Sequence, residues 1–133
     1  MYSIPFSLPD AYGGMAEADG ILQFDGIAIL LEFQVKDAIF GVIKSEVKRV
    51  TLHADDIAAV QFKRKVFKGQ ITLRSHTVNA ISEVPGQKGG EVKISIKKKY
   101  CEDAEELISA LRLAVTEAKV SALNKRDQKN FER

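Results

Sequence analysis

The feature that most constrains the fold of this chain is a change in apolar periodicity near its C-terminus. From residue 20 to about residue 97, apolar residues recur at every second position in short runs that turn residues separate. This period places one face of each run in a core and is typical of β-strands. After residue 101 the apolar residues recur at three- and four-residue spacing, which predicts one amphipathic α-helix. Many strands followed by one helix indicate a mainly β domain rather than a βαβ sheet.

The apolar runs predict about seven strands. Residues 21–24 and 27–35 flank Asp25-Gly26, a dipeptide that favours a tight hairpin. Further strands are expected over residues 47–52, 58–67, 70–75, 78–84 and 92–97, with turns at 53–56 and at 68–69. Ile27 is expected to face the core, and so are Val60, Phe62 and Val66.

The helix is expected from about Asp103 to Leu123. Its predicted core-facing residues are Ala104, Leu107, Ile108, Leu111, Ala114, Val115, Ala118 and Ala122. Asp103 and Glu106 match a capping box, although the N-cap lies equally well one or two residues earlier. Four acids crowd the first turns, where the helix dipole favours them. The polar tail at 124–133 is expected to fray.

Residues 1–19 are expected to form an N-terminal arm outside a domain that spans 20–123. The arm carries alternating apolar residues, namely Tyr2, Ile4, Phe6 and Leu8. Pro5 and Pro9 argue against a central strand, since proline has no N–H to donate to a ladder. Three alternatives stay open at this point: the arm packs on its own domain, packs on a neighbouring molecule, or is a frayed leader, with Met15 as a second start site.

Composition limits the class of protein. At 133 residues, with 45% apolar and 29% charged residues, the chain is expected to be one soluble globular domain. The longest apolar run, 27–31, is far shorter than the roughly 20 residues of a membrane span. The only cysteine, Cys101, excludes an intrachain disulfide and a multi-cysteine zinc site. With no secretory signal in view, the expected compartment is the cytoplasm.

Charge is distributed unevenly along the chain. Residues 1–35 hold five acids and no Lys or Arg, residues 36–99 hold 14 bases and six acids, and residues 100–133 hold six bases and seven acids. The three segments therefore carry −5, +8 and −1, which agrees with the net charge of +2. An anionic partner would bind the middle segment. The alternative is that lysines simply solubilise exposed strand faces.

Several short motifs are similar to those of a known group of proteins. They are Val50-Thr51-Leu52 leading into Asp55-Asp56-Ile57, then Val84-Pro85-Gly86, Gly89-Gly90-Glu91-Val92 and Ala104-Glu105-Glu106-Leu107. With them, residues 20–119 resemble uncharacterised bacterial PH-like (pleckstrin-homology-like) domain proteins. The resemblance implies a split barrel of about seven antiparallel strands in two near-orthogonal sheets, capped by the C-terminal helix. It also implies binding of phosphoinositide head groups, peptides or proteins, and assembly into oligomers.

One departure from that group concerns the ligand. Phosphoinositide-binding PH domains carry a lysine and a Lys/Arg-x-Arg cluster around their first hairpin loop. Here that loop is Phe24-Asp25-Gly26-Ile27, which is short and acidic. Head-group binding at that position is therefore disfavoured.

The sequence predicts no enzyme, no metal and no cofactor. His53 and His76 are the only histidines, both lie next to turns, and neither belongs to a spaced motif that would hold a base near a nucleophile. His53 with Asp55 and Asp56 is interpreted as a turn and cap rather than a metal site. Cys101 lies near the helix start beside four acids and is assigned no role.

A basic hairpin is the candidate binding site. Lys63 and Lys65 are expected on one strand face, with Thr72 and Arg74 on the same face of the partner strand. The predicted anionic-ligand patch is Lys63, Lys65, Arg74, Lys93 and Lys97. Phe67 alone is too little for the aromatic platforms of single-stranded nucleic-acid binders, so nucleic acid is disfavoured. An anionic lipid head group or an acidic protein surface would use the same patch.

Self-association is the leading functional prediction. Two apolar segments have no obvious place in one small barrel, and their residues are Tyr2, Ile4, Phe6, Leu8, Ile39, Phe40, Val42 and Ile43. The end of the helix adds Val120 and Leu123. A homo-oligomer would cover such surface, and the alternative is that both segments fold back over their own barrel. The chain is thus predicted to be a non-enzymatic protein-interaction module, with anionic-ligand binding through the basic hairpin as the alternative.

Overall fold

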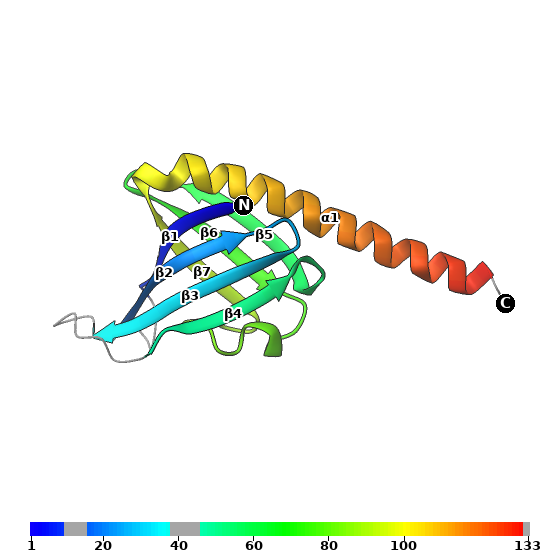
Figure 1. Cartoon of the computed structure of the whole chain (residues 1–133), viewed down its shortest axis with the longest axis horizontal. Helices are drawn as coiled ribbons and strands as arrows, with labels where there is room; N and C mark the ends of the chain where they lie inside the picture. The colour runs from blue at the N-terminus through cyan, green and yellow to red at the C-terminus, as the bar shows by residue number, and fades with distance from the viewer. Residues whose placement is uncertain (10–15, 38–45, 132–133) are drawn as a thin grey trace.

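A computed structural model of the chain describes residues 1–9, 16–37 and 46–131, with side chains up to Lys125 except that of Asp37. The described strands are β1 (Tyr2–Leu8), β2 (Ala16–Phe24), β3 (Ala28–Asp37), β4 (Lys48–His53), β5 (Ile57–Arg64), β6 (Lys68–Ser75) and β7 (Glu91–Lys97). One long helix, α1 (Cys101–Phe131), follows them (Figure 1). Within the described ranges, three single-turn helices connect elements: η2 (Ala54–Asp56), η3 (Asn79–Ile81) and η4 (Lys98–Tyr100).

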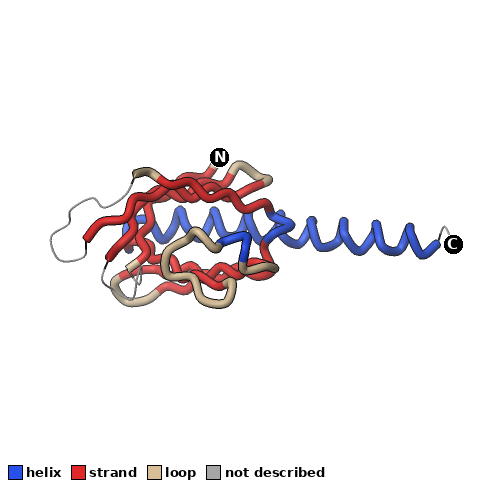
Figure 2. Tube along the Cα trace, turned by 90° about the horizontal axis from the view of Figure 1, so that it is seen from below, coloured by secondary structure: helices blue, strands red, loops and turns tan. Residues whose placement is uncertain are grey.

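The strands form one antiparallel sheet in the order β4-β3-β2-β1-β7-β6-β5. Its two halves meet where β1 lies beside β7, and there the register contains the single pair Ser7↔Ser95. The sheet folds over so that the strands form two layers, with α1 behind the space between them (Figure 2). Within the described ranges no pairing joins the edge strands β4 and β5, so the sheet is open. The predicted mainly β fold, with about seven antiparallel strands and a C-terminal helix, is confirmed at this level.

The N-terminal segment is not an arm. β1 lies inside the sheet, and its pairing with β2 runs from Tyr2↔Phe24 to Leu8↔Ala18. Alternate side chains on it are buried in the core, namely Ile4, Phe6 and Leu8. The prolines misled the prediction: Pro5 lies within β1, opposite Ile21. A strand that lacks one N–H is tolerated here because its second neighbour, β7, makes few ladder contacts with it.

The predicted hairpin at Asp25-Gly26 is confirmed, with a longer turn. Phe24 pairs with Ile29, and the turn between them ends at Ala28. The Asp25 carboxylate accepts hydrogen bonds from the backbone N–H groups of Ile27 (2.8 Å) and Ala28 (2.9 Å). These bonds, Ala28 first, hold the pKa of Asp25 below its ordinary value. Ile27 therefore lies in the turn, 69% exposed, and the prediction that it faces the core is wrong.

Residues 78–84 do not form the predicted strand. They contain η3 and turns, although Ile81 and Val84 are still buried. Two apolar residues three positions apart suit a helical turn, which a period-2 interpretation of this stretch overlooked.

Helix α1 begins at Cys101, two residues before the predicted start, and continues to Phe131. Its core-facing side is confirmed for Ala104, Leu107, Ile108, Leu111 and Val115. These side chains belong to the same buried cluster as residues of all seven strands. Ala114 and Ala118 are only half-buried, and the prediction that Ala122 faces the core is wrong, because α1 has passed the edge of the sheet there and Ala122 is exposed. The helix packs against β5, β1 and β7 and then runs on past the sheet (Figure 1). Helical backbone continues for eight residues past Leu123, the predicted end of the helix, so the first part of the predicted polar tail is helical.

Candidate anionic-surface site

The β5–β6 hairpin turns two residues earlier than the sequence predicted. Arg64 pairs with Gly69, and the backbone N–H of Lys65 donates to the carbonyl oxygen of Lys68 at 2.7 Å. The two residues at the tip of the turn are therefore Val66 and Phe67. Gly69, which the sequence placed in the turn, is a buried residue of β6.

Gly69 is needed for packing and not for the turn. A Cβ built on it would lie 2.7 Å from the ring of Phe62 and 2.8 Å from the Sγ atom of Cys101. The glycine thus lets the half-buried ring of Phe62 and the buried thiol of Cys101 approach the β6 backbone. A lysine-glycine pair reads locally as a turn, and only the neighbouring elements show otherwise.

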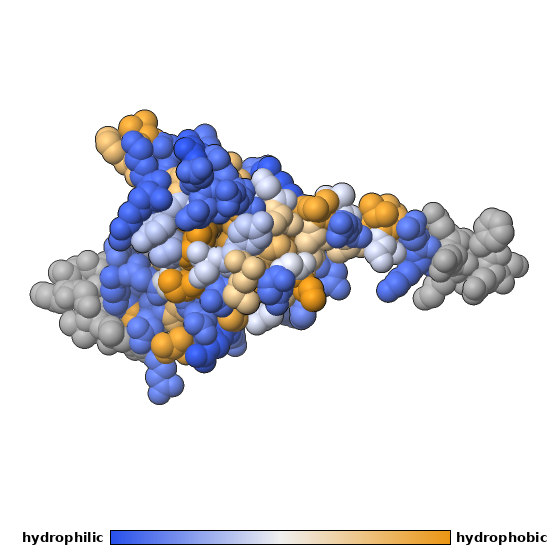
Figure 3. Space-filling model, turned by 45° about the horizontal axis from the view of Figure 1, so that its top comes forward, coloured by the Kyte–Doolittle hydropathy of each residue, from blue (hydrophilic) through white to orange (hydrophobic). Residues whose placement is uncertain are grey.

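The tip exposes two large apolar side chains. Val66 is 74% exposed and Phe67 is 85% exposed, so the prediction that Val66 faces the core is wrong. The turn lies at the upper left of Figure 1, beside the start of α1. The same corner of the molecule carries apolar atoms on a hydrophilic surround in Figure 3.

Basic residues surround this tip. Lys63, Lys65 and Lys68 belong to the hairpin and are exposed. The exposed Lys97 of β7 pairs in register with Lys68, and η4 follows it directly. We call this surface the basic tip and define it as Lys63, Lys65, Val66, Phe67, Lys68, Lys97, Lys98 and Lys99. The sequence contains no Asp or Glu between residues 56 and 83 or between residues 91 and 102.

Acidic residues at this end of the molecule lie on α1. The nearest interaction is an ion pair, with Arg64 Nε 2.7 Å from Glu105 Oε1. Glu102, Glu105 and Glu106 line a shallow hollow together with Tyr2 of β1. The six lysines of the basic tip and Arg64 give seven basic side chains at this end of the molecule. The first turns of α1 contribute four acids, so this end keeps a net positive charge.

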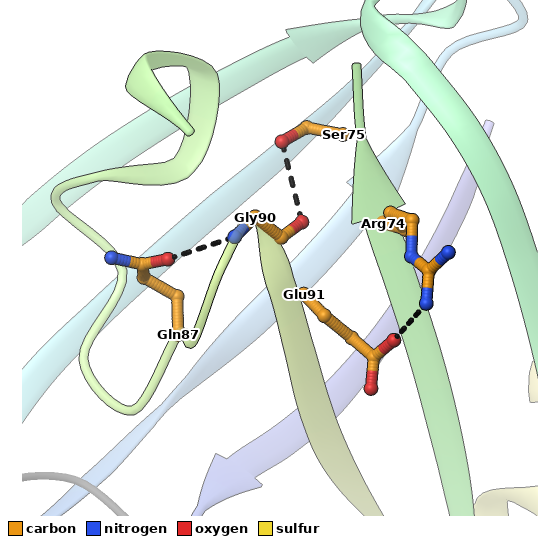
Figure 4. Close-up of polar contacts among 5 residues, drawn as sticks. All are labelled: Arg74, Ser75, Gln87, Gly90 and Glu91. Carbon is orange, nitrogen blue, oxygen red and sulfur yellow. Dashed lines mark hydrogen bonds and ion pairs between the residues drawn. The ribbon is translucent and has the colours of Figure 1, made fainter. Parts of the chain in front are cut away.

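Two residues of the predicted patch lie elsewhere. Arg74 is at the opposite end of β6, where its guanidinium forms an ion pair with Glu91 at 2.9 Å (Figure 4). Beside this pair, the Ser75 hydroxyl donates to the Gly90 carbonyl oxygen, which ties β6 to the loop before β7 (Figure 4). Lys93 is exposed in the middle of β7, opposite Thr72. The structure therefore groups Lys63, Lys65 and Lys97 and separates the other two.

The sequence interpretation missed the residues that complete the basic tip. Lys68 was assigned to the turn, and Lys98 and Lys99 were not assigned at all. The run Lys97-Lys98-Lys99 was the available signal. Its meaning depends on the register Lys68↔Lys97, which brings the end of β7 beside the hairpin.

The predicted self-association residues do not form one exposed patch. Ile4, Phe6 and Leu8 are at most 5% exposed, and Tyr2 stacks on Phe24 with ring centroids 6.5 Å apart. Their place in the core agrees with the alternative that this segment folds onto its own domain. The other four, Ile39, Phe40, Val42 and Ile43, lie outside the described residues.

The acidic first loop and the histidine turn have local structural roles. Asp25 caps its own turn, and the Asp56 carboxylate accepts a hydrogen bond from the backbone N–H of His53 at 3.1 Å. In the described ranges, no three His, Cys, Asp or Glu side chains come together in a way that would hold a metal ion. Cys101 is buried, with its thiol directed at the carbonyl oxygen of Lys97.

No family model, no curated protein and no solved structure matches the chain. Among the helices that the structure describes, none combines the length and apolar composition needed to cross a membrane. The basic tip is therefore the feature of the chain that bears on its function.

Proposed function

We propose that this chain is a non-enzymatic, cytoplasmic interaction module of PH-like, split-barrel type that binds an anionic surface through the basic tip. The observation that carries the proposal is the cross-strand pair of lysines Lys68 and Lys97. Like charges directly opposite each other in a sheet are unfavourable, so the fold gains nothing from this arrangement. An anion bound between the two would relieve the repulsion.

The remaining cations support the same partner chemistry. Lys63 and Lys65 are exposed on the hairpin, and the hairpin contains no acid to neutralise them. Other basic residues are already engaged: Lys36 with Asp19 and Arg74 with Glu91. The hydrogen bond from Asp19 raises the pKa of Lys36. The basic tip thus groups several exposed lysines at one end of the molecule, where an external anion can bind them together.

The test is a charge reversal of Lys63, Lys65 and Lys68 to Glu. Each lysine near an anionic membrane contributes about 1 kcal/mol, so losing three weakens binding by at least roughly a hundredfold. Binding is measured by sedimentation with vesicles of phosphatidylcholine and phosphatidylserine at low and high salt. The melting temperature is expected to stay close to that of the wild type, because all three side chains are exposed.

A matched control separates local from net charge. Reversing Lys48, Lys88 and Lys125 to Glu makes the same change in net charge at exposed positions away from the basic tip. This variant is expected to keep most of the binding. Equal losses in the two variants, or wild-type binding that ignores salt, would contradict the proposal.

A second candidate function, self-association, is favoured by the end of α1. Beyond the sheet Val120 is 50% exposed and Leu123 is 58% exposed. Leu123 lines a hollow of about 470 Å³ with Ala118 and Ala122. A second copy of the chain fits this surface, since an antiparallel helix pair hides the same patch on both partners.

Charge supports such a pair. Asp55 lies beside Ala118 at the rim of the hollow, and Lys125 lies near the end of the described side chains. An antiparallel pairing centred near Ser121 would bring Lys125 of one copy toward Asp55 of the other. Opposite charges at both ends of the pair would then set its register.

Light scattering tests this candidate. The wild type is expected to be a dimer, and Leu123→Asp a monomer, because the charge would be buried between the helices. Leu113→Asp is the control, since Leu113 is 62% exposed on the part of α1 that covers the sheet. A wild-type monomer at concentrations up to about 1 mM would exclude the pair.

A further inference from the structure

We propose that the partner of the basic tip is a lipid bilayer with anionic head groups, and that Val66 and Phe67 insert into it. This inference rests on the proposed function and specifies its partner. Val66 is 74% exposed and Phe67 is 85% exposed. Among the large apolar side chains described, only that of the N-terminal Met1 is more exposed, at 88%. Val66 and Phe67 stand together at the end of one hairpin.

The tip residues have no role inside the fold. Tight turns favour Gly, Asn, Asp, Pro and Ser, which satisfy turn backbone geometry or hydrogen bonds, and large apolar side chains offer neither. The next apolar residue of the hairpin, Phe62, packs against the core as expected of a structural residue. Val66 and Phe67 contribute no comparable burial, so their apolar surface is available to a partner.

The shape of the site selects among partners. The surface area that two side chains at a projecting tip can bury is far smaller than the roughly 800 Å² that each partner buries in a typical protein interface. A single aromatic ring is also too little for a row of stacked bases. A bilayer requires no matching pocket, since its head-group region accepts an apolar tip wherever charge brings the protein close.

The arrangement of charge around the tip fits this partner. Lys65 and Lys68 directly flank the two apolar residues in the turn. Lys97 lies one strand further, opposite Lys68, and is followed by Lys98 and Lys99. Apolar residues in the centre with lysines around them match the layers of an anionic membrane, where head-group charge lies outside the acyl region.

A tryptophan at the tip gives a direct measurement, because the chain contains no tryptophan of its own. The emission of Phe67→Trp is expected to shift to the blue when vesicles of phosphatidylcholine and phosphatidylserine are added. Lipids with brominated acyl chains are expected to quench it. Vesicles of phosphatidylcholine alone are expected to give neither effect at the same lipid concentration.

The matched control is Ile27→Trp. Ile27 is also an exposed apolar residue in a hairpin turn, at 69%. Its carbonyl oxygen accepts a hydrogen bond from Ala54 next to the start of β5, so it lies at the other end of that strand from the tip. The eight residues of β5 separate the two positions by roughly 25 Å. This tryptophan is expected to stay unquenched on bound protein.

A second variant tests the contribution of the tip to affinity. Replacing Val66 and Phe67 together by Ser is expected to weaken vesicle binding by about tenfold to a hundredfold, as the loss of two inserted apolar side chains implies. The residual binding is expected to remain sensitive to salt, since the lysines are unchanged.

The outcomes separate this inference from the proposed function. Unchanged, unquenched emission from Phe67→Trp on vesicles that do bind the protein would overturn insertion and leave anionic-surface binding standing. Failure to bind these vesicles, with salt-sensitive binding to polyglutamate or single-stranded DNA instead, would also overturn the bilayer as partner. A wild-type protein that binds neither the vesicles nor polyglutamate nor single-stranded DNA would contradict both the proposed function and membrane insertion.

Discussion

Gly20→Ala is expected to destabilise the protein by about 3 kcal/mol, the upper end of what overpacking costs. Gly20 lies in β2 and pairs with Phe6 of β1 and with Phe33 of β3. A Cβ at this position would lie 1.7 Å from the carbonyl oxygen of Glu32, whereas ordinary contact begins at 3.4 Å. The obstructing atom belongs to the β3 backbone, which cannot rotate away as a side chain would. The β2–β3 pairing would have to open.

Urea denaturation followed by circular dichroism measures the effect. Gly89→Ala is the control, because its Cβ would meet no atom within 4 Å. Its positive φ of 60° still costs about 1 kcal/mol with a side chain present, so the two variants separate crowding from backbone strain. A Gly20→Ala protein within about half a kcal/mol of the wild type would show that β2 and β3 do not approach so closely.

Leu111→Ala is expected to cost about 2–5 kcal/mol, because it leaves a cavity under α1. Leu111 is fully buried, on the side of α1 that faces the sheet. Leu113→Ala on the same helix is the matched control, since Leu113 is 62% exposed and the helix propensities change equally. The control is expected to stay within about half a kcal/mol of the wild type. Equal effects of the two substitutions, measured by the same denaturation, would mean that the helix presents a different face to the sheet.

The candidate site was only partly predictable. The positive charge of the middle segment and the exposure of Lys63, Lys65 and Lys97 followed from composition and alternation. Arg74 was wrongly included because strand parity says which face a residue occupies but not how far along the sheet it lies. The pair with Glu91 depends on the β6–β7 register.

The position predicted for one turn determined which residues of the whole hairpin were assigned to the core. With a turn at Lys68-Gly69, Val66 counts as a core residue and Phe67 as its neighbour. With the turn at its actual place, both become the most exposed part of the site. The choice depends on Phe62 and Cys101, which occupy the space above Gly69. The thiol belongs to a residue 32 positions away, so no local signal contains this information.

Local periodicity by itself determined which face of most strands is buried and which side of α1 packs, because burial of an apolar face follows from a repeat of two or 3.6 residues. Only the tertiary structure decided which strands are neighbours. β1 became an inner strand because its apolar side chains complete the core between β2 and β7, which outweighs one missing donor at Pro5. Lys68 lies opposite Lys97, 29 residues away in the chain, because β6 and β7 pair in this register. Pairing between distant segments is a property of the assembled sheet, and from it arises the surface that we assign to an anionic membrane.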